Sequence, residues 1–166
     1  IPKDGNVLDL SCAYGAFLKR LYKLSPNLKL FGIDISEDDI AKAMQELLTA
    51  SFSAEDEQSL SFADGTFDIV FSMMSLHHYK NIEKMFSEVA RVLKPQGIFY
   101  LVDLIPKYKW AQKFHNWRTC PEPYHFEKFY LKSELKMTLN LTNLDFVSDK
   151  SLTFFPRIRI LAFKKV

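Results

Sequence analysis

The sequence has few of the residues and patterns that define several protein classes. Its 166 residues include only two cysteines and five glycines. Two cysteines are too few for a disulfide framework or a four-cysteine zinc site. No apolar run approaches the ~20 residues of a membrane-spanning helix, and no basic-then-apolar leader opens the chain. We therefore expect a single cytoplasmic domain with no membrane partner.

Positive and negative side chains are nearly equal in number over the whole sequence, but the two signs are unevenly divided along it. Residues 1–83 hold 7 Lys and Arg against 13 Asp and Glu, whereas residues 84–166 hold 15 against 7. The hydrophobic fraction of 48% and the charged fraction of 25% are those of a globular protein, which excludes a disordered chain. Either the division of charge matters only for solubility, or each half meets a different ligand.

Short apolar strands alternate with amphipathic helices over the first two thirds of the chain. We expect strands at 7–11, 29–35, 67–73 and 97–104, and helices at 15–24, 36–48 and 82–93. In the second helix, Ser36 and Asp39 form a capping-box-like start. A stripe of apolar residues predicts its buried face: Ile40, Met44, Leu47 and Leu48. The alternation indicates βαβ units and an open, doubly wound α/β sheet.

Two segments do not follow this alternation. Residues 49–65 are polar, with a short strand expected only near their start. Residues 107–130 carry eight aromatic side chains, including both tryptophans. A helix is expected at about 133–141. The last two strands, 146–154 and 157–166, are separated by too few residues for a crossover helix, so they must pair as an antiparallel hairpin.

In doubly wound sheets, ligands bind beyond the carboxyl ends of the strands. Asp9, Asp34 and Asp56 fall at such positions, and the loop Ser11–Gly15 joins the first strand to its helix. Small loop residues let a ligand approach the free N–H groups of the helix start. Asp34 can accept hydrogen bonds from both hydroxyls of a ribose. Because the loop lacks G-x-G-x-x-G, it favours a ribonucleoside without phosphates over a nicotinamide dinucleotide.

Four segments, in order, resemble motifs of class I S-adenosylmethionine (SAM)-dependent methyltransferases. VLDLSCAYG resembles V-L-D-x-G-C-G-x-G, and LFGIDIS resembles the second motif. DEQSLSFADGTFDIVFSMMSLHH resembles the G-D-A-x-x-L-P-F-x-D-x-S-F-D-x-V-x-S-x-x-x-L-H-H block of the methyltransferase type 11 group. EVARVLKPQGIFYLVDL resembles its R-V-L-K-P-G-G passage. The likeness runs from Val7 to Leu104 and resumes at the terminal helix and hairpin.

The resemblance implies a Rossmann-like α/β fold with a seven-stranded sheet of order 3-2-1-4-5-7-6, in which strand 7 is antiparallel. Residues 1–166 would form one domain with a lid-like insertion at about 105–132, and without the N-terminal helical segment of many relatives. The implied activity is transfer of a methyl group from SAM to a small molecule. The alternative is a methyltransferase-fold partner or regulatory subunit that binds SAM weakly or not at all.

That alternative arises from the loop, because Ser11 and Ala13 stand where the family usually has glycine and only Gly15 keeps its place. Glu55 and Gln96 also replace family glycines. By resemblance, the backbone of the loop would hold the methionyl part of SAM, with Asp9 in support. Asp9 could instead stabilise the loop through its N–H groups.

The resemblance also assigns residues to the rest of the cofactor. The implied sites are Asp34 and Ile35 for the ribose, Asp56 and the Glu57 backbone for the adenine, and Ser72 and Met73 for the sulfonium and methyl. Two of these positions have another interpretation. Asp34 could cap the following helix, and Asp56 could belong to a solvated loop.

The candidates for a general base are histidines, since neutral imidazole accepts protons near pH 7. They are His77, His78, His115 and His125. Adjacent histidines on a helix point in different directions and make a poor metal pair, so no metal is expected. In the family these two are mostly positional, with one packing under the cofactor cleft.

The aromatic and basic segment has two interpretations. Trp110, Phe114 and Trp117 have helical spacing and would usually form a buried face. The segment could instead be a substrate lid, with candidates Tyr108, His115, Arg118, Tyr124 and His125. Its basic residues would suit an anionic or planar acceptor. Segments in which basic and aromatic residues alternate can bind single-stranded nucleic acid. No RNA-binding module is visible in the sequence, so a nucleic-acid partner is not expected.

Overall fold

The computed structural model describes residues 3–79, 81–119, 128–139, 142–153 and 158–166, with only the backbone at 115 and 117–119. The strands are β1 (Gly5–Leu10), β2 (Leu28–Asp34), β3 (Ser51–Ala54), β4 (Phe67–Met73), β5 (Leu93–Leu104), β6 (Leu144–Ser151) and β7 (Ile158–Lys165). The helices are α1 (Ala16–Leu24), α2 (Glu37–Glu46), the 3₁₀ turn η1 (Leu76–His78), α3 (Ile82–Val92), α4 (Lys109–Thr119) and α5 (Lys132–Leu139).

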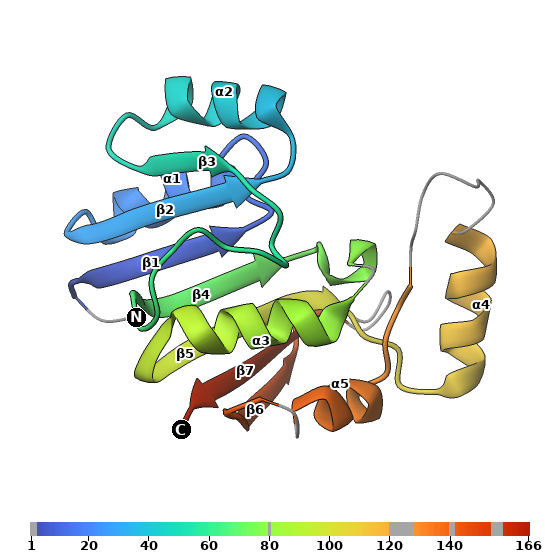
Figure 1. Cartoon of the computed structure of the whole chain (residues 1–166). Coiled ribbons are helices and arrows are strands. Elements are labelled where there is room, and N and C mark those ends of the chain that lie inside the picture. The colour runs from blue at the N-terminus through green and yellow to red at the C-terminus, as the bar shows by residue number, and fades with distance from the viewer. Residues whose placement is uncertain (1–2, 80, 120–127, 140–141, 154–157) are drawn as a thin grey trace.

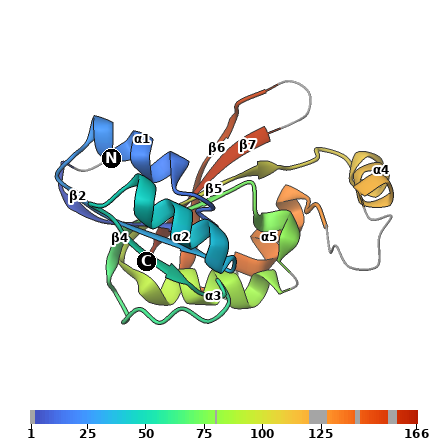
Figure 2. The same ribbon diagram turned by 90° about the horizontal axis from the view of Figure 1, so that it is seen from above.

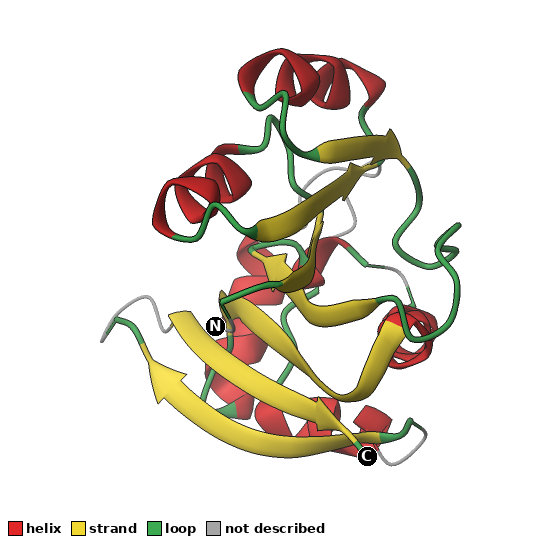
Figure 3. Cartoon of the chain, turned by 90° about the vertical axis from the view of Figure 1, so that its left-hand side faces the viewer, coloured by secondary structure: helices red, strands yellow, loops and turns green. Residues whose placement is uncertain are grey.

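All of these strands belong to one sheet of order β3-β2-β1-β4-β5-β7-β6. Neighbours from β3 to β5 are parallel, whereas β7 runs antiparallel to both β5 and β6. The sheet twists strongly along its width (Figure 3). The strand order and the antiparallel strand 7 are therefore as the resemblance implies, and the terminal hairpin is as the spacing of the last two strands predicts. The short strand expected near residue 49 is β3.

Helices cover both faces of the sheet, so the core has two halves. Helices α1 and α2 pack on one face and α3 and α5 on the other (Figures 1 and 2). The first half contains Leu18, Leu21, Ile40 and Phe52. The second half contains Met85, Phe86, Phe99, Leu135 and Phe163. With both faces covered, the central strands bury apolar side chains toward both layers of helices, as in other parallel sheets.

The predicted buried face of α2 is partly wrong. Ile40 and Leu47 are buried, but Met44 is 47% exposed and Leu48 is 87% exposed. The third buried position is Ala43 instead. Helix α2 packs mainly on β2 and β3 at the edge of the sheet, so it buries a narrow face, and it ends before Leu48. Its start is as predicted, because Ser36 Oγ accepts a hydrogen bond of 3.2 Å from Asp39 N.

Trp110 and Phe114 of α4 are exposed, so the predicted buried face is wrong for these two residues; the side chain of Trp117 lies outside the described part of the chain. Trp110 is 71% exposed and Phe114 is 49% exposed. The side facing the protein holds two amides. Gln112 Nε2 donates to the Phe129 carbonyl at 2.9 Å, and Asn116 Oδ1 accepts from Phe129 N at 2.9 Å. Polar side chains therefore attach α4 to the rest of the fold, while the rings of Trp110 and Phe114 are in contact with solvent.

The fold also answers the question of membrane-spanning segments within the described parts of the chain. None of the helices there is both long and apolar enough to cross a bilayer.

Candidate active site

A cleft of about 590 Å³ lies at the carboxyl ends of β1, β2 and β4. Seven of the ten predicted cofactor residues line it, and five further residues complete it. The predicted ones are Ser11, Ala13, Asp34, Ile35, Asp56, Glu57 and Met73. The others are Gln58, Met74, Ser75, His78 and Tyr79. Parallel strands end at the same edge, which brings together residues that are up to 68 positions apart in the chain.

The loop after β1 has the backbone shape of a glycine loop although two of its glycines are absent. Ser11, Ala13 and Gly15 have φ angles of 56°, 46° and 76°. All three lie in the left-handed region, where a side chain costs roughly 1 kcal/mol or more. Gly15 does not line the cleft. It begins α1, and a Cβ there would lie 3.1 Å from the Phe52 ring.

Replacing Ala13 by Gly is therefore expected to stabilise the protein by about 1 kcal/mol. The free energy of unfolding in urea measures this. Ala41→Gly is the matched control, because Ala41 is exposed within α2, where glycine should cost about 1 kcal/mol. Equal losses of stability in the two variants would show that residue 13 is not strained.

Asp34 connects this loop to the start of α2. Its Oδ2 accepts from Ala13 N at 2.9 Å, and its Oδ1 accepts from Ser36 N at 3.0 Å. Ser36 caps α2 with its own hydroxyl. Asp34 thus orders two neighbouring loops at the edge of the cleft. Each carboxylate oxygen can accept a further hydrogen bond from a ligand.

Asp9 lies beneath the loop and is 2% exposed. Its Oδ1 has no hydrogen-bond partner among the residues that the structure describes. Burial, with repulsion from Asp34 as a second cause, raises the pKa of the Asp9 carboxyl to about 8. A buried acceptor without a partner is costly, and a cationic ligand group in the cleft would lower that cost.

A chain of hydroxyl groups crosses the floor of the cleft. Ser72 Oγ and Ser75 Oγ lie 2.9 Å apart, and Ser75 Oγ and Tyr79 Oη also lie 2.9 Å apart. Tyr79 Oη lies 3.1 Å from Ser11 Oγ, which donates to the Glu57 carboxylate. Burial raises the pKa of Tyr79 above its ordinary value, so the phenol keeps its proton. Burial also raises the pKa of Glu57, although the bond from Ser11 opposes this.

When Glu57 is ionised, all hydrogen bonds in this row of hydroxyl groups donate toward Glu57. A carboxylate only accepts, so Ser11 must donate to Glu57, and Tyr79 must then donate to Ser11. By the same reasoning the two serines donate toward Tyr79. The hydroxyl of Ser11, absent from a family member with glycine here, completes the connection to Glu57.

The residues after β3 form a tight turn at the rim. Asp56 Oδ1 accepts from Gln58 N at 2.8 Å and from Gln58 Nε2 at 3.2 Å. Glu55, which replaces a family glycine, accepts from Ser53 Oγ at 2.7 Å and Ser61 N at 2.9 Å. Glu55 therefore orders the turn, while Asp56 lines the cleft.

Sequence similarity shows the family to which the chain with this cleft belongs. A family model described as "Methyltransferase domain" matches residues 1–149. This chain belongs to the class I SAM-dependent methyltransferases. The cofactor of the family is SAM, whose ammonium, sulfonium and ribose groups suit the buried Asp9 acceptor and the Asp34 carboxylate. The role of each residue toward SAM stays a prediction.

The methyltransferase is similar to proteins with different acceptors. It is 33% identical over 106 residues to 2-methyl-6-phytyl-1,4-hydroquinone methyltransferase of Synechocystis, covering 62% of this chain and 33% of that protein. It is 32% identical over 104 residues to fatty-acid O-methyltransferase of Mycolicibacterium smegmatis, covering 61% and 38%. The chain thus spans about a third of the length of these relatives.

A solved structure shows the same fold. A SAM-dependent methyltransferase of Methanosarcina mazei superposes with a TM-score of 0.80 at 21% identity, covering 100% of this chain and 94% of that one. Together with the strand order, this supports the Rossmann-like architecture.

The two adjacent histidines of the methyltransferase have different partners. His77 Nδ1 lies 2.9 Å from Asp103 Oδ1, and its ring stacks on Phe129 with the centroids 5.1 Å apart. An ionised carboxylate accepts, so Nδ1 carries the proton. His78 lines the cleft instead. The rings do not simply point apart as predicted. Their centroids are 4.2 Å apart, because the imidazole held by Asp103 lies against that of His78.

Two of the remaining predicted site residues that the structure describes, Ser72 and Tyr108, do not line the cleft. Ser72 is fully buried in the hydroxyl chain. Tyr108 stacks on Trp110 outside, with the centroids 6.2 Å apart. Tyr124, His125 and the side chains of His115 and Arg118 lie outside the described residues.

Four lining residues besides His78 were missed by the sequence reasoning: Gln58, Met74, Ser75 and Tyr79. The spacing of Ser75 and Tyr79, four residues apart around a helical turn, is the signal that could have placed both on one side.

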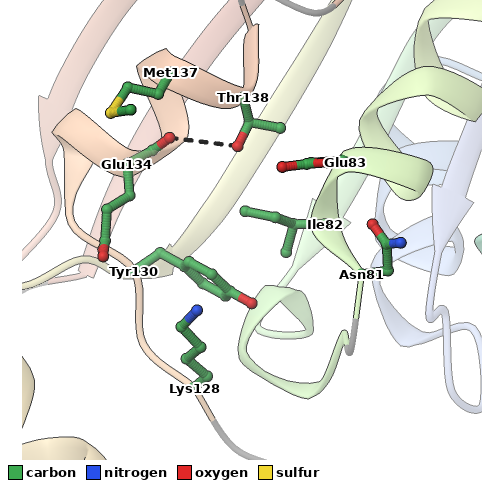
Figure 4. A pocket seen from close by; sticks show the side chains of 8 residues that line it. All are labelled: Asn81, Ile82, Glu83, Lys128, Tyr130, Glu134, Met137 and Thr138. Carbon is green, nitrogen blue, oxygen red and sulfur yellow. Dashed lines mark hydrogen bonds between the residues drawn. The ribbon is translucent and has the colours of Figure 1, made fainter.

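A second cavity, of about 670 Å³, lies between the start of α3 and α5. Side chains from the start of α3 face those of α5 across it, with Lys128 and Tyr130 at one end (Figure 4). Its carboxylates are Glu83 and Glu134, and Glu134 Oε2 already accepts from Gln112 Nε2 at 2.6 Å. None of the predicted cofactor residues lines this cavity.

Proposed function

We propose that this chain binds SAM in the cleft at the strand ends and catalyses methyl transfer to an apolar small-molecule acceptor. The observation that carries the proposal is the left-handed loop joined by a hydrogen bond to Asp34 and placed above the buried Asp9. The names of the relatives that act on a phytyl hydroquinone and a fatty acid support an apolar, lipid-like acceptor.

Bound SAM supplies a methyl group that is already activated by the positive sulfur. The work of the protein is then to position the two reactants and exclude water. The loop backbone at Ser11 and Ala13 holds the methionyl part, with Asp9 as an acceptor beneath it. Asp34 orients the ribose, and Asp56 faces the adenine. Met73 and Met74 provide an apolar wall on the acceptor side.

An acceptor hydroxyl or carboxyl that must lose a proton needs a base nearby. We propose His78 for this role, because its side chain lines the cleft. His77 is then a positioning residue, since Asp103 holds its ring at 2.9 Å and the ring packs against His78. Tyr79 is a poor base candidate, since its hydroxyl is held in the buried chain.

His78→Ala is expected to slow methyl transfer by about 100-fold or more, the usual contribution of a general base. Tritium transfer from labelled SAM to a fatty acid and to a prenylated hydroquinone measures it. Asp103→Asn, which only loosens His77, should slow transfer less and should be partly rescued by Asp103→Glu. Affinity for S-adenosylhomocysteine should change little in each variant. Unchanged transfer in His78→Ala would remove this histidine from the mechanism.

The cofactor proposal is tested directly by calorimetric titration with S-adenosylhomocysteine. Saturable 1:1 binding, competed by SAM but not by NAD, is expected. No binding at millimolar ligand would favour the alternative function, a methyltransferase-fold partner subunit. The comparisons give that alternative no support.

A further inference from the structure

Helix α4 has a composition unlike the rest of the chain. Residues 107–119 contain four Lys and Arg and no Asp or Glu, together with four of the chain's aromatic side chains. A helix with basic and aromatic residues but no acid is typical of segments that lie on a membrane surface.

The packing of α4 presents several of these residues, among those with described side chains, to solvent. The tryptophan at position 110 is 71% exposed, and Lys109 and Lys113 are exposed beside it. Tyr108 stacks parallel to Trp110 at an interplanar angle of 11°, with Lys107 Nζ 5.0 Å from the centre of the Tyr108 ring. This set, Lys107, Tyr108, Lys109, Trp110 and Lys113, is called the α4 face below.

The inward side of α4 explains why the rings point outward. Gln112 is buried and donates to both the Phe129 carbonyl and Glu134 Oε2. Asn116 accepts from Phe129 N. Turning α4 to bury Trp110 would break these bonds and leave buried polar groups without partners, which is unfavourable. The exposed orientation is therefore built into the fold.

The position of α4 relates the face to the cleft. The parallel strands point toward the end of the molecule where α4 stands, beyond the carboxyl end of β5 (Figures 1 and 2). The cleft opens at the same strand ends. A surface that contacts the α4 face would thus lie near the edge from which an acceptor approaches.

We propose that the α4 face docks on an anionic lipid bilayer. Tryptophan and tyrosine favour the headgroup region of a bilayer, and lysines are attracted to anionic lipids. The sequence predicted no membrane partner because it has no spanning segment, but a helix that lies on the surface needs none. Docking would bring a lipid-like acceptor to the strand ends. This consequence rests on the proposed function, whereas the docking itself does not.

Flotation with vesicles of phosphatidylcholine, with and without phosphatidylglycerol, tests the docking. We expect the protein to float with the anionic vesicles and much less with the neutral ones, and added salt to weaken binding. The variant K107Q/K109Q/K113Q should bind anionic vesicles about 100-fold more weakly. Trp110→Ala should bind about tenfold more weakly to the same vesicles.

The matched control removes the same charge from the other end of the sheet. Lys3, Lys23 and Lys29 are exposed near the amino ends of the strands, and K3Q/K23Q/K29Q should float like the unaltered protein. Equal loss in both triple variants would mean that only net charge matters, and would overturn the proposal. No flotation with anionic vesicles would also overturn it and would favour a protein partner for the α4 face.

The outcome is distinguishable from a failure of the proposed function. A protein that binds S-adenosylhomocysteine but not vesicles keeps the function and loses the docking. If the protein binds vesicles but not S-adenosylhomocysteine, the docking is supported and the proposed function is overturned.

Discussion

Asp34→Ala is expected to weaken the binding of S-adenosylhomocysteine about 30- to 150-fold, which corresponds to about 2–3 kcal/mol. The carboxylate stands at the end of β2, and each of its oxygens has room for a ribose hydroxyl besides its backbone donor. The variant also frees Ala13 N and Ser36 N, so the loop loses its connection to α2. Calorimetric titration well below the unfolding temperature measures the affinity.

Two further variants separate ligand contact from loop order. Asp34→Asn keeps the size of the side chain and one acceptor oxygen, so its loss should be smaller than that of alanine. Asp38→Ala removes an exposed acid from the first turn of α2 and should leave affinity unchanged. Unaltered affinity in Asp34→Ala would mean that the ribose does not lie at the end of β2.

The second large effect concerns the dependence of stability on pH. Asp9 has a pKa of about 8 in the folded protein and about 3.9 in an unfolded chain. Between these values the folded state binds more protons, so stability falls as the pH rises through this window. Asp9→Asn should abolish this loss, which amounts to at most about 4 kcal/mol between pH 5 and pH 8.

Urea unfolding of the unaltered protein and of Asp9→Asn at pH 5, 6.5 and 8 measures how the free energy of unfolding of each depends on pH. A constant cost of burying the amide does not affect this comparison, because it is the same at each pH. Parallel stability profiles would show that Asp9 is ionised in the folded protein. If a cationic part of the ligand lies near Asp9, binding must also release protons below pH 8. Calorimetry of S-adenosylhomocysteine in two buffers of different ionisation enthalpy detects this release.

The fold was predictable from the sequence because its periodicities are strong and local. The strands β1, β2, β4 and β5 bury apolar side chains on both faces of the sheet, so each appears in the sequence as a short segment rich in apolar residues. Which apolar residues of a helix at the edge of the sheet are buried was less predictable. Met44 and Leu48 fit a helical stripe, but whether an apolar residue is covered depends on what lies opposite, and α2 sits at an edge.

The position of a cleft residue was predictable where an acidic residue ends a buried strand, as Asp34 does at the end of β2. Side-chain contacts between distant segments were not predictable, because the spacing of residues within one helix or strand contains no information about its partners elsewhere in the chain. The bond of Ser11 to Glu57 crosses 46 positions, and the pair of His77 with Asp103 crosses 26. The outward orientation of Trp110 follows from amides that bind a backbone 13 and 17 residues away.

The serine in the loop also constrains how this protein can evolve. Ser11 has the backbone strain that a glycine would relieve, yet its hydroxyl joins Tyr79 to Glu57. Selection for stability and selection for the hydrogen bonds of the Ser11 hydroxyl then act on one codon in opposite directions. A lineage that returns to glycine here should have lost or replaced the acid at position 57 as well, so the two positions are expected to change together.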